Sequence, residues 1–218
     1  MINRYNRRML NAEPGFIFGA LSIVLMLCSR AGYFADIFRG RTRPHVFSWF
    51  IWGTISSIGF AAQVAEGAGP GSWARGFGSF TCFLLVFISY FKGEKDITRA
   101  DWLTLAVALS AIPLWVLTKT PFWSVLIVCF IDTIGYLPTL RKSWLKPQDE
   151  LAVSYFFSCL GAAFSLVAIR EYTPSTWLYP LVLTFSNGGM WLFLLARRRV
   201  SAAAASAAGK HLQRGRLR

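Results

Sequence analysis

The fold of this chain is organised around residues 132–147, DTIGYLPTLRKSWLKP. An apolar run of membrane-helix length contains a carboxylate at Asp132 and a proline at Pro138, and basic residues follow it. A carboxylate at bilayer depth is costly, and by default it marks a functional site. A proline inside a helix frees the carbonyl group four residues earlier, which then needs another partner. We therefore expect this stretch to pair with another part of the chain.

The composition is that of a membrane protein. Of the 218 residues, 55% are hydrophobic and 15% are charged, whereas soluble domains carry about 25% charged residues. The charges lie between apolar runs, as topology signals do, so the net charge of +13 does not indicate nucleic-acid binding. The cysteines and histidines lack metal-ligand spacing. We expect no metal, no cofactor and no enzymatic activity, because no nucleophile or phosphate-binding motif is present.

Seven apolar runs approach the length of about 20 residues that a bilayer-spanning helix needs. The loops between them are short, so runs that follow each other should be antiparallel. Prolines precede the first, third, fifth and seventh runs, where a missing N–H is not needed. The predicted spans are residues 15–38, 46–65, 73–91, 101–118, 122–141, 151–169 and 177–196.

The distribution of Lys and Arg predicts the orientation of the chain in the membrane. More basic residues flank one face, which includes the tail at residues 197–218, while Arg75 counts among the basic residues of the other face. We predict an integral protein of the cell (inner) membrane, with the N-terminus outside and the C-terminus cytoplasmic. The basic segment at residues 1–14 favours the opposite orientation. The tail is either a solvated anchor or a contact for anionic lipids.

An internal repeat supplies the partner of the opening stretch. Tyr33 and Pro44 have the same spacing as Tyr136 and Pro147, and both intervals cross a basic loop. Further matches follow in the same order, with offsets of 103, 106 and 104 residues. These matches are Gly32-Tyr33 with Gly135-Tyr136, Pro44 with Pro147, Ser48-Trp-Phe50 with Ser154-Tyr-Phe156, and Ser72-Trp73 with Thr176-Trp177.

The predicted fold is therefore an all-α integral membrane protein with a three-plus-one-plus-three architecture. A three-helix repeat at residues 15–91 and a second one at residues 121–196 are joined by a loop and linker helix at residues 92–120. An odd number of spans separates matched positions, so the repeats are parallel. Secondary transporters use such repeats and place the substrate site at the repeat interface near the bilayer midplane.

This arrangement resembles the SWEET and PQ-loop superfamily of seven-helix transporters, of which the chain looks like a divergent member. Residues 138–139 (Pro-Thr) occupy the place of the family's Pro-Gln pair, and residues 186–188 (Ser-Asn-Gly) resemble its Pro-Asn-Gly. The first repeat instead has Ala35 and Phe83 at the matching positions. The resemblance implies alternating access between two triple-helix bundles, with Asn187 facing a small polar solute.

Asp132 is the first candidate for chemistry, and Arg30 is its predicted partner. The offset of 103 residues matches Asp132 to Ser29, the neighbour of Arg30, so both charges should lie at the same depth. Pairing lowers the cost of two charges in hydrocarbon. We expect them to approach each other, directly or through water. The pair either only fixes helix packing, or acts as a gate or a proton-coupling carboxylate.

Other candidates have a structural and a functional interpretation. Pro138 is either a packing kink or a hinge, and Asn187 either bonds between helices or contacts substrate. Trp49 and Trp52 share a helix face. We expect Trp49 in the interfacial belt and Trp52 deeper, where it could stack on a solute. The predicted substrate-binding or gating residues are Arg30, Tyr33, Trp52, Asp132, Tyr136, Pro138 and Asn187.

The leading hypothesis is a membrane carrier for a small polar solute, such as a sugar or another small metabolite. Proton coupling and homo-oligomerisation are left open. The alternative is a non-transporting receptor, scaffold or assembly subunit of the same fold, which could fill the midplane with Phe and Trp instead of a polar cavity. A third interpretation is a subunit of a lipid-modifying enzyme, which needs a headgroup-level polar cluster and would have Asp36, Arg39 and Arg41 for it.

Overall fold

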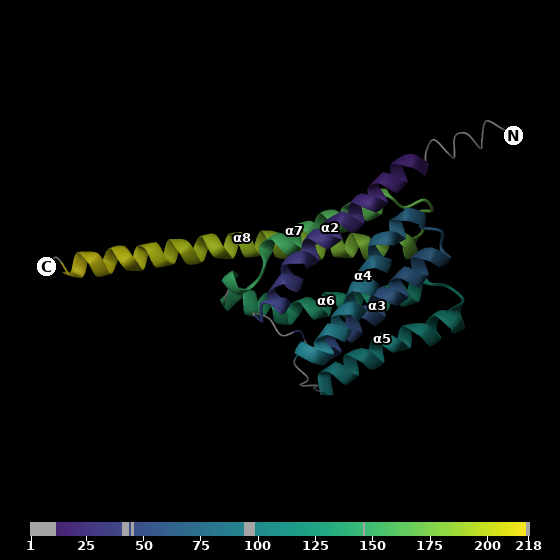
Figure 1. The fold of residues 1–218 in the computed structure, drawn as a ribbon, viewed down its shortest axis with the longest axis horizontal. Coiled ribbons are helices and arrows are strands. Elements are labelled where there is room, and N and C mark those ends of the chain that lie inside the picture. The colour runs from purple at the N-terminus through teal and green to yellow at the C-terminus, as the bar shows by residue number, and fades with distance from the viewer. Residues whose placement is uncertain (1–11, 41–43, 45, 94–98, 146, 217–218) are drawn as a thin grey trace.

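The computed structural model describes residues 12–40, 44, 46–93, 99–145 and 147–216. All regular secondary structure in this part of the chain is helical, and it contains no strand (Figure 1). Residues 1–11, Arg41 and Arg43, on which parts of the predicted topology rest, lie outside it. The elements are α2 (Ala12–Phe38), α3 (Val46–Ala65), the 3₁₀ helix η1 (Gly69–Ser72), α4 (Trp73–Lys92), α5 (Arg99–Thr118), α6 (Phe122–Leu145), the 3₁₀ helix η2 (Pro147–Asp149), α7 (Ala152–Val167) and α8 (Pro174–Arg216).

The α-helices coincide with the predicted apolar runs to within a few residues, except at the end of α8. Prolines lie where the sequence places them, at helix starts on one end of the bundle. Pro14 is in the first turn of α2, Pro70 is in η1, Pro121 precedes α6, and Pro174 opens α8. We call this the proline end. The opposite end holds the α2–α3, α4–α5 and α6–α7 connections, and we call it the basic end.

Helix α8 is longer than predicted. Its apolar run was expected to stop at residue 196, but the helix continues to Arg216 and extends beyond the bundle (Figure 1). The extension is rich in alanine, the residue with the strongest helix propensity, and has no proline to stop it. At its base, Arg197 donates to the Trp144 carbonyl at 2.8 Å and Arg198 Nε donates to the Pro147 carbonyl at 3.0 Å. The first tail residues therefore fasten α8 to the α6–α7 connection.

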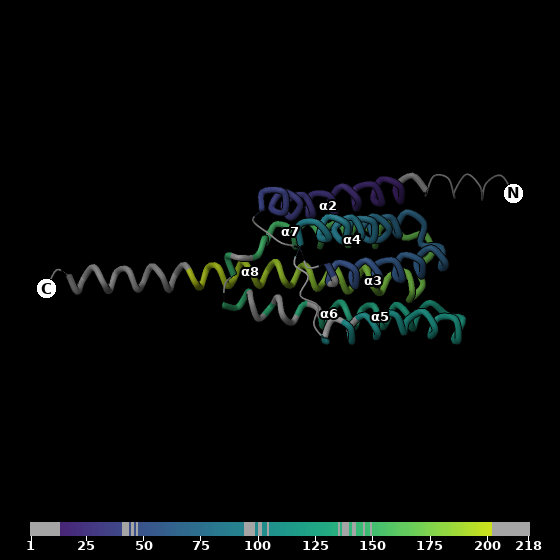
Figure 2. Tube along the Cα trace, turned by 60° about the horizontal axis from the view of Figure 1, so that its bottom comes forward, coloured from purple at the N-terminus to yellow at the C-terminus, as the bar shows by residue number. Residues whose placement is uncertain are grey.

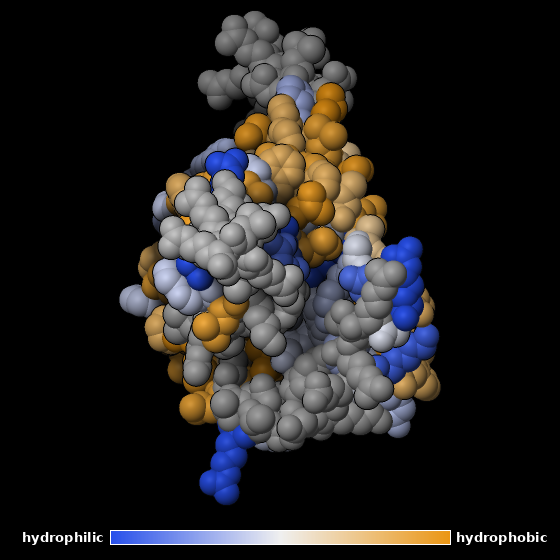
Figure 3. Space-filling model, turned by 90° about the vertical axis from the view of Figure 1, so that its left-hand side faces the viewer, coloured by the Kyte–Doolittle hydropathy of each residue, from blue (hydrophilic) through white to orange (hydrophobic). Residues whose placement is uncertain are grey.

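The outer surface fits a lipid environment. Three helical segments are long and apolar enough to cross a membrane: Pro14–Phe38, Gly69–Lys92 and Pro174–Ser201. Large apolar side chains on the outside are exposed, as Phe80 and Phe87 of α4 are. Viewed from the basic end, hydrophobic residues cover much of the outside, and hydrophilic residues line a hollow between two parts of the molecule (Figure 3). The chain is therefore a helical membrane protein.

The helices pack in two similar groups. In the first, α4 packs against both α2 and α3; in the second, α8 packs against both α6 and α7. Between the groups, α2 packs on α7 and α3 packs on α6. Helix α5 lies on the outside of the bundle against α6 and α3 (Figure 2). Small residues permit the close contact of α2 with α7, since a Cβ added to Gly161 would lie 3.3 Å from the Ser22 carbonyl oxygen.

Another proline interrupts the hydrogen bonding of a helix, at Pro180 in α8. Because Pro180 has no N–H, the carbonyl of Thr176 loses its donor within the helix. Gln63 of α3 replaces it, donating from Nε2 to the Thr176 carbonyl at 2.9 Å, and both residues are buried. A replacement donor of the kind expected around Pro138 is thus found at Pro180. Its hydrogen bond joins α3 to α8 and so links the two groups of helices.

Candidate functional site

A cavity of about 440 Å³ lies between the two groups of helices. Its described lining residues come from α2, α3 and α4 on one side and from α6, α7, α8 and the α6–α7 connection on the other, with none from α5. The volume lies within the range of about 300–1,000 Å³ that is usual for small-molecule sites. Many of the lining side chains are polar or charged, which is unusual for the interior of a helical membrane protein.

The structure brings six of the seven predicted site residues to this cavity. They come from four different helices, so the fold gathers residues that are up to 157 positions apart. Pro138 lies within α6, but its side chain is outside the described part of the structure, and the hinge interpretation stays a prediction. Whether the six bind a solute also stays a prediction. The six are Arg30, Tyr33, Trp52, Asp132, Tyr136 and Asn187.

Asp132 has a neutral partner. Its Oδ1 accepts a hydrogen bond from the Tyr179 hydroxyl at 3.4 Å, while its Oδ2 is buried without a hydrogen-bond partner. Among the described residues, Arg30 forms no ion pair with Asp132; its guanidinium lies over the ring of Trp49, 5.0 Å from the centroid. The two charges share one cavity, but the direct form of the predicted pair is not made.

Arg75 is a site residue that the sequence prediction missed. It was counted only among the basic residues of the outer face, but it lies in the first turn of α4, points into the bundle, and is only 8% exposed. Its guanidinium packs over the Tyr179 ring at 4.1 Å, and Nη1 donates to Ser56 Oγ at 3.3 Å, while Nε has no partner. The repeat could have revealed it, because the offset of 104 matches Arg75 to Tyr179.

Arg75, Tyr179 and Asp132 therefore form a connected series across the two groups of helices. Two further carboxylates, Asp36 and Glu150, line the cavity toward the basic end. Both make interactions there, including the hydrogen bond that the Tyr155 hydroxyl donates to Glu150 at 3.2 Å.

The two tryptophans differ in burial. Trp49 was expected in the interfacial belt, but it is 4% exposed and donates from Nε1 to the Tyr33 hydroxyl at 3.3 Å. Trp52 is 38% exposed and contacts Trp49 edge to face at 5.0 Å, and its stacking on a solute stays a prediction. The reason is that the packing of α3 on α2 and α4 covers the face that carries Trp49. Both residues line the cavity.

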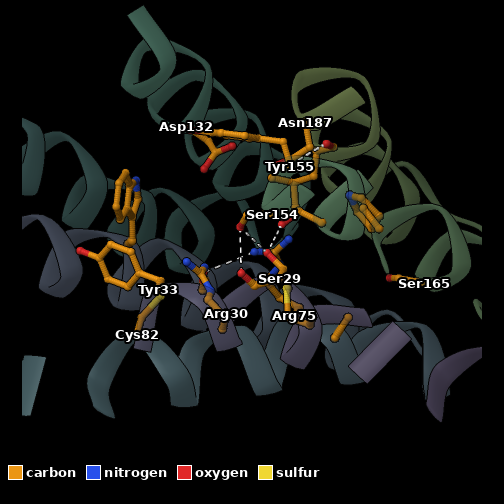
Figure 4. A pocket seen from close by; sticks show the side chains of 18 of the residues that line it. Ser29, Arg30, Tyr33, Arg75, Cys82, Asp132, Ser154, Tyr155, Ser165 and Asn187 are labelled. Atoms are coloured by element: carbon orange, nitrogen blue, oxygen red, sulfur yellow. Dashed lines mark hydrogen bonds between the residues drawn. The ribbon is translucent and has the colours of Figure 1, made fainter. Parts of the chain in front are cut away.

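A cluster of hydroxyl groups joins α2 to α7 at the cavity wall (Figure 4). Ser29 Oγ lies 3.0 Å from Ser154 Oγ and 2.7 Å from Ser158 Oγ. Ser154 Oγ also lies 2.8 Å from the Ser29 carbonyl, to which it can donate. Hydroxyls both donate and accept, so this wall could hold the polar groups of a solute. Sequence reasoning used two of these serines only as markers of the repeat.

Asn187 satisfies its amide within its own helix. It is buried at the cavity and donates from Nδ2 to the Leu183 carbonyl at 2.8 Å. The described hydrogen bond is therefore not the interhelical one that the packing interpretation predicted. Its contact with a substrate, which the family resemblance implies, stays a prediction.

The described residues contain no group of three or more His, Cys, Asp or Glu that could hold a metal ion. The cysteines are free, and two of them, Cys82 and Cys129, are buried. Comparison of the chain with protein-family models, with curated proteins and with solved structures finds no significant match. The function is therefore argued from the geometry of the cavity.

Proposed function

We propose that this protein carries a small polar solute across a membrane, through the cavity between two three-helix units. The units are α2–α4 and α6–α8, and α5 is the linker between them. This is the three-plus-one-plus-three plan of the SWEET and PQ-loop superfamily. In it, the units rock against each other and open the cavity to one side of the membrane at a time.

The order of packing supports this division. In each unit the third helix packs against both the first and the second: α4 against α2 and α3, and α8 against α6 and α7. The contacts between units are also matched, because α2 packs on α7 as α6 packs on α3. This is the pattern expected for a pseudo-twofold axis along the membrane normal.

The cavity lining supports the repeat at the level of residues. The register found in the sequence matches lining residues of one unit to lining residues of the other. Arg75 and Tyr179, one such pair, contact each other, as expected for residues near the axis. The matched lining pairs are Ser29 with Asp132, Tyr33 with Tyr136, Trp49 with Tyr155, Trp52 with Ser158, Ser56 with Ala162, and Arg75 with Tyr179.

The observation that carries the proposal is the polarity of this cavity. Arg75 Nε and Asp132 Oδ2 are buried and have no hydrogen-bond partner in the described structure. Such groups are expensive in a membrane protein, and a scaffold gains nothing from them. A carrier gains a binding site for polar groups. The many Phe and Trp side chains, which a scaffold could use to fill this space, instead leave a cavity of 440 Å³.

We further propose the cell (inner) membrane as the location, with the basic end on the cytoplasmic side. Arg39, Lys92 and Arg197 to Arg199 lie at or near the basic end, whereas Lys119 and Arg170 lie at the proline end. By the positive-inside rule, the end with more Lys and Arg faces the cytoplasm. This supports an orientation with the N-terminus outside and the C-terminus in the cytoplasm.

Cysteine accessibility tests the proposal without knowledge of the solute. In a background without native cysteines, Ser158→Cys places one thiol on the cavity wall. A membrane-impermeant maleimide should label it in both right-side-out and inside-out vesicles, because the cavity opens to each side in turn. The matched control, Phe80→Cys, faces lipid and should react from neither side. Labelling of Ser158→Cys from one side only, or from none, would favour the non-transporting alternative.

A further inference from the structure

The charges of the proposed transport site indicate which class of solute it takes. Two guanidinium groups, Arg30 and Arg75, and one carboxylate, Asp132, line the middle of the cavity. Both arginines line the same cavity as Asp132, and Arg75 packs over Tyr179, whose hydroxyl donates to Asp132. Among these three groups, positive charges outnumber negative charges by two to one.

The arginines lack anionic partners. Among the described residues neither forms an ion pair; Arg75 packs over Tyr179 and donates to the neutral hydroxyl of Ser56, and Arg30 packs over Trp49. The Nε atoms of both are buried without a hydrogen-bond partner. Arg75 is also more than nine-tenths buried. A guanidinium in this state binds carboxylates strongly, because its donors match the two carboxylate oxygens and water does not compete.

The remaining carboxylates of the lining lie toward the basic end of the cavity. Asp36 lies in the last two turns of α2, beyond Arg30 toward the basic end, and Glu150 lies in the α6–α7 connection. Both have interactions there. Asp132 faces the Tyr179 hydroxyl, which leaves only its Oδ2 for another partner. The described lining as a whole has three carboxylates and two guanidinium groups. In the middle of the cavity, next to the serine cluster, the guanidinium groups outnumber the one carboxylate, Asp132 (Figure 4).

We propose that the solute is a small organic anion with a carboxylate group, held by Arg75 and Arg30. This inference rests on the proposed transport site. The carboxylate neutralises the excess positive charge, and Ser29 and its neighbours receive the hydroxyl or carbonyl groups of the solute. Trp49 and Trp52 cover its apolar part. Asp132 acts against anion binding, so its replacement should strengthen binding.

Binding to the purified full-length chain in detergent tests this inference independently of transport. The midpoint of thermal unfolding, followed by tryptophan fluorescence, is measured with solutes that differ in charge and little in size. One set is lactate, lactamide and alanine, which are anionic, neutral and zwitterionic; the other is glucuronate and glucose. We expect the anion of each set to raise the midpoint more than its uncharged or zwitterionic counterparts.

Variants assign the effect to the cavity. Arg75→Gln and Arg30→Gln should each weaken binding of the better anion at least about tenfold, the usual loss for a charge-assisted hydrogen bond. Asp132→Asn should strengthen it. Arg99→Gln, which removes an exposed arginine at the start of α5, should leave it unchanged. If an arginine variant does not fold, the inference is still tested by whether Asp132→Asn strengthens or weakens anion binding.

Several results would overturn the inference. The first is that glucose, lactamide or alanine stabilises the protein as much as the anions do, or more. The second is that neither anion stabilises it. The third is that Asp132→Asn binds the anion more weakly than the wild-type protein does. Each of these would leave the proposed transport function standing if Ser158→Cys is labelled from both sides. Conversely, anion binding together with labelling of Ser158→Cys from one side only would support the proposed anion site and contradict the transport function.

Discussion

Replacing Gln63 with leucine should destabilise the protein through a single carbonyl group. Pro180 leaves the Thr176 carbonyl without its helical donor, and Gln63 Nε2 supplies the substitute at 2.9 Å. Thr176 is fully buried and does not line the cavity, so water does not take over the bond. An orphaned buried acceptor costs about 1–3 kcal/mol, and interhelical bonds in membrane proteins reach about 1.7 kcal/mol. We expect Gln63→Leu to lower the free energy of unfolding by about 1–2 kcal/mol.

A second substitution tests whether the loss of this hydrogen bond causes the destabilisation by Gln63→Leu. Pro180→Ala restores an N–H at position 180, which can donate to the Thr176 carbonyl within α8. Gln63→Leu should then cost much less in the Pro180→Ala background than in the wild-type background. The free energy of unfolding is measured by titration with a denaturing detergent in mixed micelles, followed by helical circular dichroism. The four proteins of the cycle give the coupling energy directly.

A matched cycle controls for general effects of Pro180→Ala. Ser57, on the same helix as Gln63, bonds instead to Ser79 of α4 at 2.6 Å. Ser57→Ala and Pro180→Ala should therefore be additive within about 0.5 kcal/mol. A coupling energy for Gln63 and Pro180 no larger than that of this control would refute the interpretation of the hydrogen bond.

Two further stability predictions have matched controls. Gly71→Ala should destabilise the protein by about 1–3 kcal/mol, because the added Cβ would lie 2.8 Å from the backbone of the α7–α8 turn. The control, Gly189→Ala, meets nothing within 4 Å and should be neutral or slightly stabilising. Equal effects of the two substitutions on the unfolding midpoint would contradict the prediction for Gly71. Arg197→Gln should cost about 1 kcal/mol through loss of its stacking on Trp144 and its bond to that carbonyl. Arg199→Gln, an exposed neighbour, should cost nothing measurable by the same titration.

Some features of the site could be predicted because the repeat constrains them. Parallel repeats place matched positions at the same depth, so Tyr33 and Tyr136, and Arg30 and Asp132, were expected together, and all four line the cavity. Gln63 and Pro180 could not be linked in this way, since their offset does not belong to the repeat. Their contact depends on how α3 lies against α8.

Composition and the lengths of the apolar runs by themselves determined that the chain is helical and belongs in a membrane, and where the helices begin. These properties depend on local hydrogen bonding and on the length of apolar runs, both of which are written in consecutive residues. Only the tertiary structure decided that Arg75 enters the cavity and that Trp49 is more buried than Trp52. The direction of a side chain depends on the rotation of its helix, which contacts between helices fix. The rotation of α4 about its axis therefore decides whether Arg75 is an exposed charge or a candidate binding residue.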